Sequence, residues 1–166
     1  MFRDEDTLVT GGKNHIYFWD LRTQSKKKGI FGRSPGVRLQ TVVSLSPFGD
    51  PSEGMLASGM ASGHVYLWKE RNCIRAVRAH DMAVSCLHGL PSGLATGSRD
   101  GTVRLWSAGM EAKATLDITA CGGYDCAVRA VVWRQEEGTV VVGTKGCEVF
   151  EVRASDGRDV HGGPIV

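Results

Sequence analysis

The sequence predicts an all-β fold assembled from repeated antiparallel strands. Short apolar runs alternate with turn residues, and the 166 residues include 22 Gly but only 5 Pro. A hairpin pattern also recurs, most clearly in the stretch LATGSRDGTVRLW at residues 94–106, where Asp100-Gly101 favours a tight turn between two strands. An isolated hairpin is marginally stable in water, so we expect its copies to pack against one another.

Three further copies of the hairpin are present. They are TGGKNHIYFW at residues 10–19, SGMASGHVYLW at 58–68, and the looser VGTKGCEVF at 142–150. A period of about 40–45 residues, with a tryptophan closing the third strand of a unit, is typical of WD-repeat β-propellers. In this interpretation Trp19, Trp68 and Trp106 are the blade tryptophans.

The order of the strands predicts an incomplete propeller, an open arc of about four blade equivalents within one partial domain covering residues 1–166. The expected units are a partial blade at 8–32, blades at 40–79 and 80–119, a partial blade at 127–152, and a tail at 153–166. The first blade lacks an inner strand and the fourth lacks an outer strand. We therefore expect a fragment of a longer protein or a truncated gene product, with apolar faces exposed at both ends.

Each expected strand is a short apolar or alternating run bounded by turn residues. In the first blade these are 8–10, 15–21 and, as the outer strand, 28–31. In the second they are 41–45, 55–58, 64–68 and 74–77. In the third they are 83–88, 93–96, 102–106 and 114–118, and in the fourth 127–133, 139–142 and 147–152.

The third blade contains a set of polar residues that can form a hydrogen-bonded structural tetrad: His80, Thr96, Asp100 and Trp106. Buried imidazole, hydroxyl and indole groups need such partners, because an unpaired buried polar group costs ~1–3 kcal/mol. The same residue types also occur in Ser/Thr–His–Asp catalytic groups, but those need an exposed nucleophile and an oxyanion hole. We expect the tetrad to be structural and the other blades to be held by packing.

The segment from Leu21 to Gly49 is strongly basic. It contains no acidic residue and six cations, which are Arg22, Lys26, Lys27, Lys28, Arg33 and Arg38. One interpretation is a solvated edge on which lysines discourage strand pairing. The functional interpretation is a contact for an acidic partner. Aromatic residues do not interleave with the basic residues, which disfavours nucleic-acid binding.

Composition and motifs exclude several other classes. The net charge of +2 does not indicate a nucleic-acid or membrane partner, and no apolar run is long enough to span a membrane. Five cysteines without a CxxC pair indicate reduced thiols in a cytoplasmic chain, and neither the cysteines nor the nearby histidines have zinc-site spacing. Gly11-Gly12-Lys13 lacks the context of a phosphate-binding loop. We expect no metal, no cofactor and no enzymatic activity.

The motifs TGGKNHIYFW followed by KKKGIFG, RAHDMAVSCLHGL with TGSRDGTVRLW, and AVRAVVW with VVVGTKGCEVFEV occur in this order between residues 8 and 152. Together they resemble the echinoderm microtubule-associated protein-like family, whose members carry tandem WD-repeat propellers. The resemblance implies a non-catalytic, cytoplasmic and cytoskeletal interaction module that binds tubulin or microtubules. A general WD-repeat scaffold for a signalling or assembly complex, with other protein partners, is the alternative.

Overall fold

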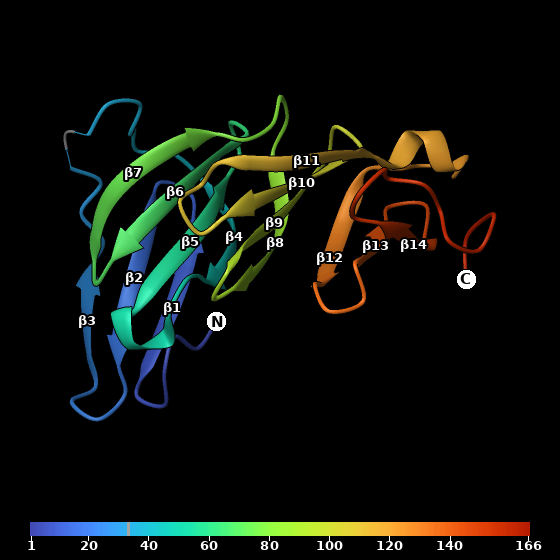
Figure 1. Cartoon of the computed structure of the whole chain (residues 1–166). Helices are drawn as coiled ribbons and strands as arrows, with labels where there is room; N and C mark the ends of the chain where they lie inside the picture. The colour runs from blue at the N-terminus through green and yellow to red at the C-terminus, as the bar shows by residue number, and fades with distance from the viewer. Residues whose placement is uncertain (33) are drawn as a thin grey trace.

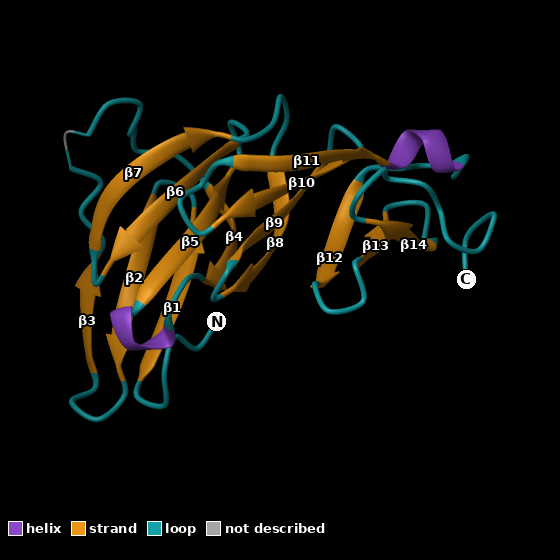
Figure 2. Ribbon diagram, in the orientation of Figure 1, coloured by secondary structure: helices purple, strands orange, loops and turns teal. Residues whose placement is uncertain are grey.

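The computed structural model describes residues 1–32 and 34–166. Its regular structure is almost entirely β, in four antiparallel sheets that follow one another along the chain (Figure 1). In the described part, the helical segments are two short 3-10 turns, η1 (Pro51–Glu53) and η2 (Ile118–Cys121), as Figure 2 shows. The first and fourth sheets lie at opposite ends of an open row, which confirms the predicted all-β, unclosed fold.

The sheets have the consecutive strand order expected of propeller blades. The first contains β1 (Thr7–Gly12), β2 (His15–Asp20) and β3 (Ser25–Lys28). The second contains β4 (Val42–Pro47), β5 (Met55–Met60), β6 (His64–Lys69) and β7 (Asn72–Arg78). The third contains β8 (Val84–Leu90), β9 (Gly93–Ser98), β10 (Thr102–Ser107) and β11 (Ala112–Asp117). The fourth contains β12 (Val128–Arg134), β13 (Thr139–Thr144) and β14 (Val149–Arg153).

The central hairpins of the first three sheets share one register. In each, the tryptophan pairs with a leucine of the preceding strand: Leu8 with Trp19, Leu56 with Trp68, and Leu94 with Trp106. In the second and third sheets the turn depends on a glycine in the left-handed region, Gly63 at φ 84° and Gly101 at φ 85°. The repeat seen in the sequence is therefore a repeat in three dimensions.

The outer strand of the first sheet begins earlier than predicted. The expected strand at 28–31 is wrong, because β3 covers Ser25–Lys28 and its Lys27 pairs with Phe18. After Gly29 the chain leaves this sheet, and Ile30 forms a parallel bridge with Asn72 on the second sheet. The turn into β3 uses Gln24 at φ 51°, a residue type that gives no turn signal in the sequence.

The two ends of the chain pair with the outward edges of β1 and β14, for which the sequence predicts no neighbouring strand. At the N-terminus, Phe2 bridges to Leu8 of β1, on the edge where the other sheets have their inner strand. At the C-terminus, Asp159 bridges to Val152, and the Val160 N–H donates to the carbonyl of Glu151 in β14. The tail thus covers part of the outer edge that the sequence analysis left open.

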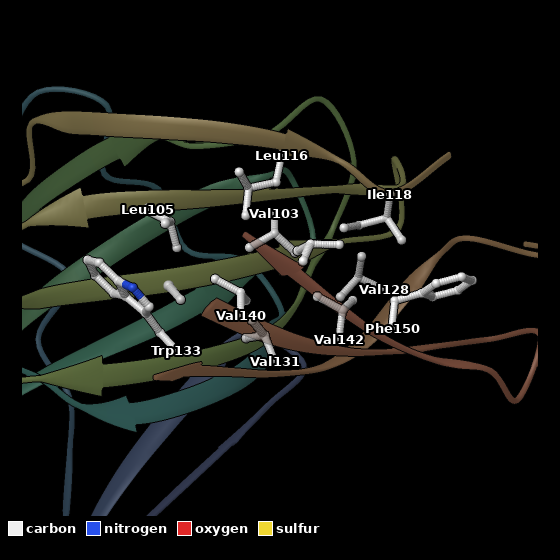
Figure 3. Packing of buried hydrophobic residues seen from close by; sticks show 12 residues of the cluster. Val103, Leu105, Leu116, Ile118, Val128, Val131, Trp133, Val140, Val142 and Phe150 are labelled. Atoms are coloured by element: carbon white, nitrogen blue, oxygen red, sulfur yellow. The ribbon is translucent and has the colours of Figure 1, made fainter. Parts of the chain in front are cut away.

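The apolar core lies between successive sheets rather than within one centre. One cluster joins the first and second sheets, another the second and third, and another the third and fourth. Figure 3 shows the last of these, in which Val103 and Leu105 of β10 meet Val140 of β13 and Trp133 of β12. Each sheet therefore depends on its neighbours for burial, as expected for repeat architectures.

Candidate functional site

The four residues of the predicted tetrad lie together in the third sheet and the segment that precedes it. The indole N–H of Trp106 on β10 donates to Thr96 Oγ1 on β9 at 3.0 Å, and Thr96 Oγ1 lies 2.7 Å from His80 Nε2. His80 and Thr96 are buried, with exposures of 1% and 0%. The three polar side chains therefore replace the water contacts that burial removes.

Asp100 completes the set from the β9–β10 turn. Its Oδ2 atom lies 3.3 Å from His80 Nδ1 and accepts the backbone N–H of Asp81 at 3.2 Å. Its Oδ1 atom accepts both the N–H and the hydroxyl of Thr102, at 2.9 and 2.7 Å. Thr102 Oγ1 also lies 3.0 Å from His80 Nδ1, so it is a fifth member that the sequence analysis missed.

One arrangement of protons satisfies the whole network. A neutral His80 with its proton on Nδ1 donates toward Asp100 and Thr102, and its Nε2 accepts the hydroxyl proton of Thr96. Burial lowers the pKa of His80, and the carboxylate of Asp100, which acts to raise it, does not offset the burial. Partial burial acts to raise the pKa of Asp100, yet the hydrogen bonds from Thr102 hold that pKa below its usual range. The network thus pairs a neutral imidazole with an ionised carboxylate.

Because this network needs a neutral His80, we expect the protein to lose stability in mild acid. The pKa of His80 is lower in the folded than in the unfolded state, so the unfolded state binds more protons as pH falls below about 6.5. The contribution of His80 is therefore complete above that pH and is lost as pH falls through the folded-state pKa. Denaturant melts from pH 7.5 to 5, with imidazole NMR titration, test this. A His80 resonance that titrates above the ordinary histidine pKa would contradict it.

Part of the tetrad also occurs in the first two sheets. Trp68 Nε1 donates to Ser58 Oγ at 2.8 Å, and Trp19 Nε1 donates to Thr10 Oγ1 at 2.9 Å. We expect these blades to be held by packing rather than by the His80–Asp100 network, and in both a strand residue with a hydroxyl adds a hydrogen bond to the indole. The matching positions of Thr10, Ser58 and Thr96 are readable in the repeat, so the sequence did contain this signal.

The second sheet has a different polar centre, which the sequence analysis missed. The Tyr66 hydroxyl accepts the Arg38 N–H at 2.8 Å and the Gln40 side-chain amide at 2.6 Å, and it lies 3.2 Å from the carbonyl of Gly36. Tyr66 is fully buried. This hydroxyl ties the segment before β4 to the second sheet, as His80, in the segment before β8, contacts the third.

The fourth sheet has no equivalent of the Trp–hydroxyl pair. Its register pairs Val152 with Val140, as Trp106 pairs with Leu94. Val152 therefore replaces the tryptophan, and Glu151 lies one residue before that position. Because side chains alternate across a strand, this one-residue shift moves Glu151 to the opposite face of the sheet.

The tetrad geometry does not present a nucleophile. Thr96 Oγ1 is fully buried and is shared by Trp106, His80 and the carbonyl of Arg104. A catalytic hydroxyl has to reach an external substrate and needs oxyanion donors beside it. The arrangement can fix the β9–β10 hairpin against the connection that contains His80, and this is the role that we assign to it.

The six predicted basic contact residues are only partly brought together. Lys26, Lys27 and Lys28 lie on β3, whose four residues are all exposed. Arg22 lies in the turn before β3 and forms an ion pair with Asp6 at 2.8 Å, an acidic neighbour that the sequence did not show. Arg38 lies in the connection to β4, and Arg33 falls outside the described residues.

Strand alternation divides the three lysines between two faces. Lys26 lies over the rings of Tyr17 and Trp19, with its ammonium 5.1 and 5.2 Å from their centroids. Lys27 points to the other face and lines a cavity of about 320 Å³ together with Arg3 and Arg71, and two carboxylates, Asp20 and Glu70, line it as well. The edge therefore offers a cation on an aromatic surface and, on the other face, a cavity of mixed charge with three cations and two carboxylates.

Two findings limit the chemistry of the described residues. No group of three or more His, Cys, Asp or Glu side chains among them is placed to hold a metal ion. Within the same residues, no helix is long and apolar enough to cross a membrane.

Known proteins with similar sequences also contain WD repeats. The family model for the WD domain, G-beta repeat, matches residues 71–107. Echinoderm microtubule-associated protein-like 2 from Rattus norvegicus and from Homo sapiens are each 34% identical over 112 residues, or 63% of this chain. The WD repeat-containing protein WDS homolog from Arabidopsis thaliana is 32% identical over 107 residues, or 61% of the chain. The chain spans 16% of the two first relatives and 20% of the third.

Among solved structures, the computationally designed Ika8 protein superposes with a TM-score of 0.72 at 20% identity. The match covers 98% of this chain and 48% of the Ika8 chain, so the propeller-like fold extends over nearly all of the sequence. With the repeated register and the Trp–hydroxyl pairs, these similarities support one interpretation. Residues 71–107 match the WD repeat, and the chain has a propeller-like fold and is similar to the echinoderm microtubule-associated protein-like proteins.

Proposed function

We propose that this chain is a non-catalytic interaction module that binds tubulin or microtubules at the cytoskeleton, in the cytoplasm. The observation that carries the proposal is the exposed basic edge of β3, in a protein whose relatives are named as microtubule-associated. Three consecutive lysines there have no acidic residue on the same strand. Such an edge attracts an acidic protein surface and fixes its orientation.

The surroundings of β3 offer three cations to an acidic side chain. Lys27, Arg3 and Arg71 line one cavity, which Asp20 and Glu70 also line, so cations outnumber carboxylates there by one. Phe18 lines the same cavity and offers apolar contact to the stem of that side chain. On the other face, Lys26 is held over Tyr17 and Trp19 rather than free in solvent, which reduces the entropy lost on binding.

Charge reversal of the edge should abolish most of the binding. We expect the Lys26→Glu, Lys27→Glu, Lys28→Glu triple variant to lose at least about tenfold in affinity, because each replaced cation loses an attraction and adds a repulsion. Co-sedimentation with microtubules over a salt series measures this, since screening weakens the wild-type interaction. A matched control carries the same charge change outside the first sheet, at Lys69 on β6, Lys113 on β11 and Arg99 in the β9–β10 turn. Equal binding by both variants would contradict the proposal.

A WD-repeat scaffold for another assembly is the second candidate. It is supported by relatives whose names mention only WD repeats, including the Arabidopsis homolog and the WD repeat-containing protein 26 homolog of Drosophila melanogaster, 30% identical over 108 residues. The same experiment separates the two candidates. Wild-type protein that stays in the supernatant at low salt would favour the scaffold over the microtubule module.

A further inference from the structure

Side chains of one inner strand bind the backbone of the next inner strand. β4, β8 and β12 are edge strands of the second, third and fourth sheets, and an edge strand has backbone groups without a partner in its own sheet. Between the second and third sheets, the N–H of Gly89 donates to Ser46 Oγ at 2.9 Å. Between the third and fourth sheets, the N–H of Trp133 donates to His88 Nδ1 at 3.0 Å. The two junctions are thus held by the same kind of bond.

The two acceptors, Ser46 and His88, occupy the same position in the repeat. Ser46 pairs with Ala57 and His88 with Ala95, and each alanine follows the leucine that pairs with the blade tryptophan. A serine hydroxyl accepts a hydrogen bond at any ordinary pH, whereas an imidazole nitrogen accepts one only while it carries no proton. The junction between the third and fourth sheets therefore contains a titratable form of a bond that does not titrate at the preceding junction.

A second hydrogen bond at each junction joins the strands near their other end. Ser44 Oγ donates to the carbonyl of Val84 at 2.9 Å, and Ser85 Oγ donates to the carbonyl of Val128. Val128 is the first residue of β12, whereas Trp133 is the last but one. Loss of the imidazole bond therefore frees one end of β12 while the other end stays attached to β8.

Burial opposes a charge on the His88 imidazole. The side chain is partly buried, and this burial lowers the pKa of His88 below the ordinary histidine value. The neighbouring strands β4 and β9 contain only uncharged residues. The other titratable and charged residues toward this end of the junction are Cys86, Lys113, Arg134, Glu136, Glu137 and Glu151. Burial raises the pKa of the Cys86 thiol to about 12, so it is neutral, and Arg134 is paired with Glu137 and Glu151.

We propose that His88 is a proton-controlled latch between the third and fourth sheets, which holds the end of β12 against β8 when the imidazole is neutral and releases it when the imidazole is protonated. A proton on Nδ1 turns that atom into a donor, which then faces the N–H of Trp133, another donor. A flip of the ring does not restore the bond, because it places a carbon atom where Nδ1 stood. The strands then separate at this end, because contact would leave both donors unpaired.

Release of this end changes the surface between the two sheets. The Trp133 ring is 8% exposed and packs with Leu105 and Val140 in the core of the junction (Figure 3). A cavity of about 340 Å³ lies beside it, lined also by Leu90 and residues 134–137. Movement of the β12–β13 turn away from β8 therefore exposes the indole and widens this cavity. The latch is closed above about pH 6.5 and opens as pH falls through the folded-state pKa of His88.

Amide hydrogen exchange on the chain tests the latch, because it reports the opening of individual hydrogen bonds. Gly89 is the internal control, since its N–H makes the matching bond to Ser46, which does not titrate. Protonation of His80 destabilises the whole protein and acts on both amides, so the ratio of the Trp133 protection factor to that of Gly89 isolates the latch. We expect this ratio to fall at least ~10-fold between pH 7.5 and pH 5, which corresponds to the loss of about one hydrogen bond.

Two variants show whether His88 is responsible. His88→Asn keeps an acceptor near the position of Nδ1 but does not titrate, so the ratio should stay close to the neutral wild-type value at both pH values. His88→Ala removes the acceptor, and the ratio should be low at both. A wild-type ratio that does not change with pH, or a ratio that falls as much in His88→Asn as in the wild type, would overturn the proposal.

Discussion

Replacing Gly63 with alanine should lower the free energy of unfolding by about 4 kcal/mol or more. The energetic cost of a left-handed backbone conformation for alanine adds to the cost of a steric clash of its Cβ atom. Gly63 forms the β5–β6 turn at φ 84°, and a Cβ built there lies 2.1 Å from the His80 carbonyl oxygen and 2.9 Å from that of Met82. Both are backbone atoms. The Gly63 carbonyl also accepts the N–H groups of Ala79 and His80, so a shift at this turn disturbs the connection that places the tetrad.

Gly138→Ala is the matched control for this prediction. Gly138 has a similar φ of 68°, but a Cβ there meets nothing within 4 Å. It should cost only the conformational penalty of ~1–2 kcal/mol. Urea denaturation of both variants, compared with the wild type, measures the difference. Equal losses of unfolding free energy in the two variants would show that the close approach of Gly63 to the His80 segment does not add to the cost of the substitution.

Asp100→Ala should destabilise the protein by about 2–3 kcal/mol. The substitution removes a carboxylate that accepts several hydrogen bonds, and their donors lose this acceptor. The backbone N–H of Asp81 and both donors of Thr102 lose their acceptor, and the Nδ1–H of His80 keeps only Thr102 Oγ1. His80 is 1% exposed, so water does not replace the carboxylate at its ring.

Ser62→Ala provides the comparison in the second sheet. Ser62 occupies the matching turn, but it is exposed and its hydroxyl contacts only His64 Nδ1, at 3.0 Å, among the hydrogen bonds of the described residues. Its loss should cost within about 0.5 kcal/mol. Asp100→Asn keeps an acceptor without the charge and should fall between the two. Equal denaturation midpoints for Asp100→Ala and Ser62→Ala would contradict a stabilising tetrad.

The sequence by itself determined the features that depend on local chain chemistry. Asp100-Gly101 and Ser62-Gly63 mark tight turns because glycine accepts a positive φ, and the flanking alternation fixes which residues share a face. The hairpins, the all-β class and the repeat follow from this. The tetrad residues could be named from the sequence because all four occur together in the third repeat, with His80 just before its first strand and Asp100 in its turn.

Only the tertiary structure decided how these elements meet, because those contacts are made by residues far apart in the sequence. Ile30 leaves the first sheet and bridges to Asn72, which ends β3 earlier than its own sequence indicates. Asp6 pairs with Arg22 and so reduces the charge of the basic segment. The terminal residues pair with the edges of β1 and β14, and no local sequence pattern predicts this pairing. The free N–H and C=O groups of a strand edge can pair with any segment that the fold places beside them, whatever its side chains.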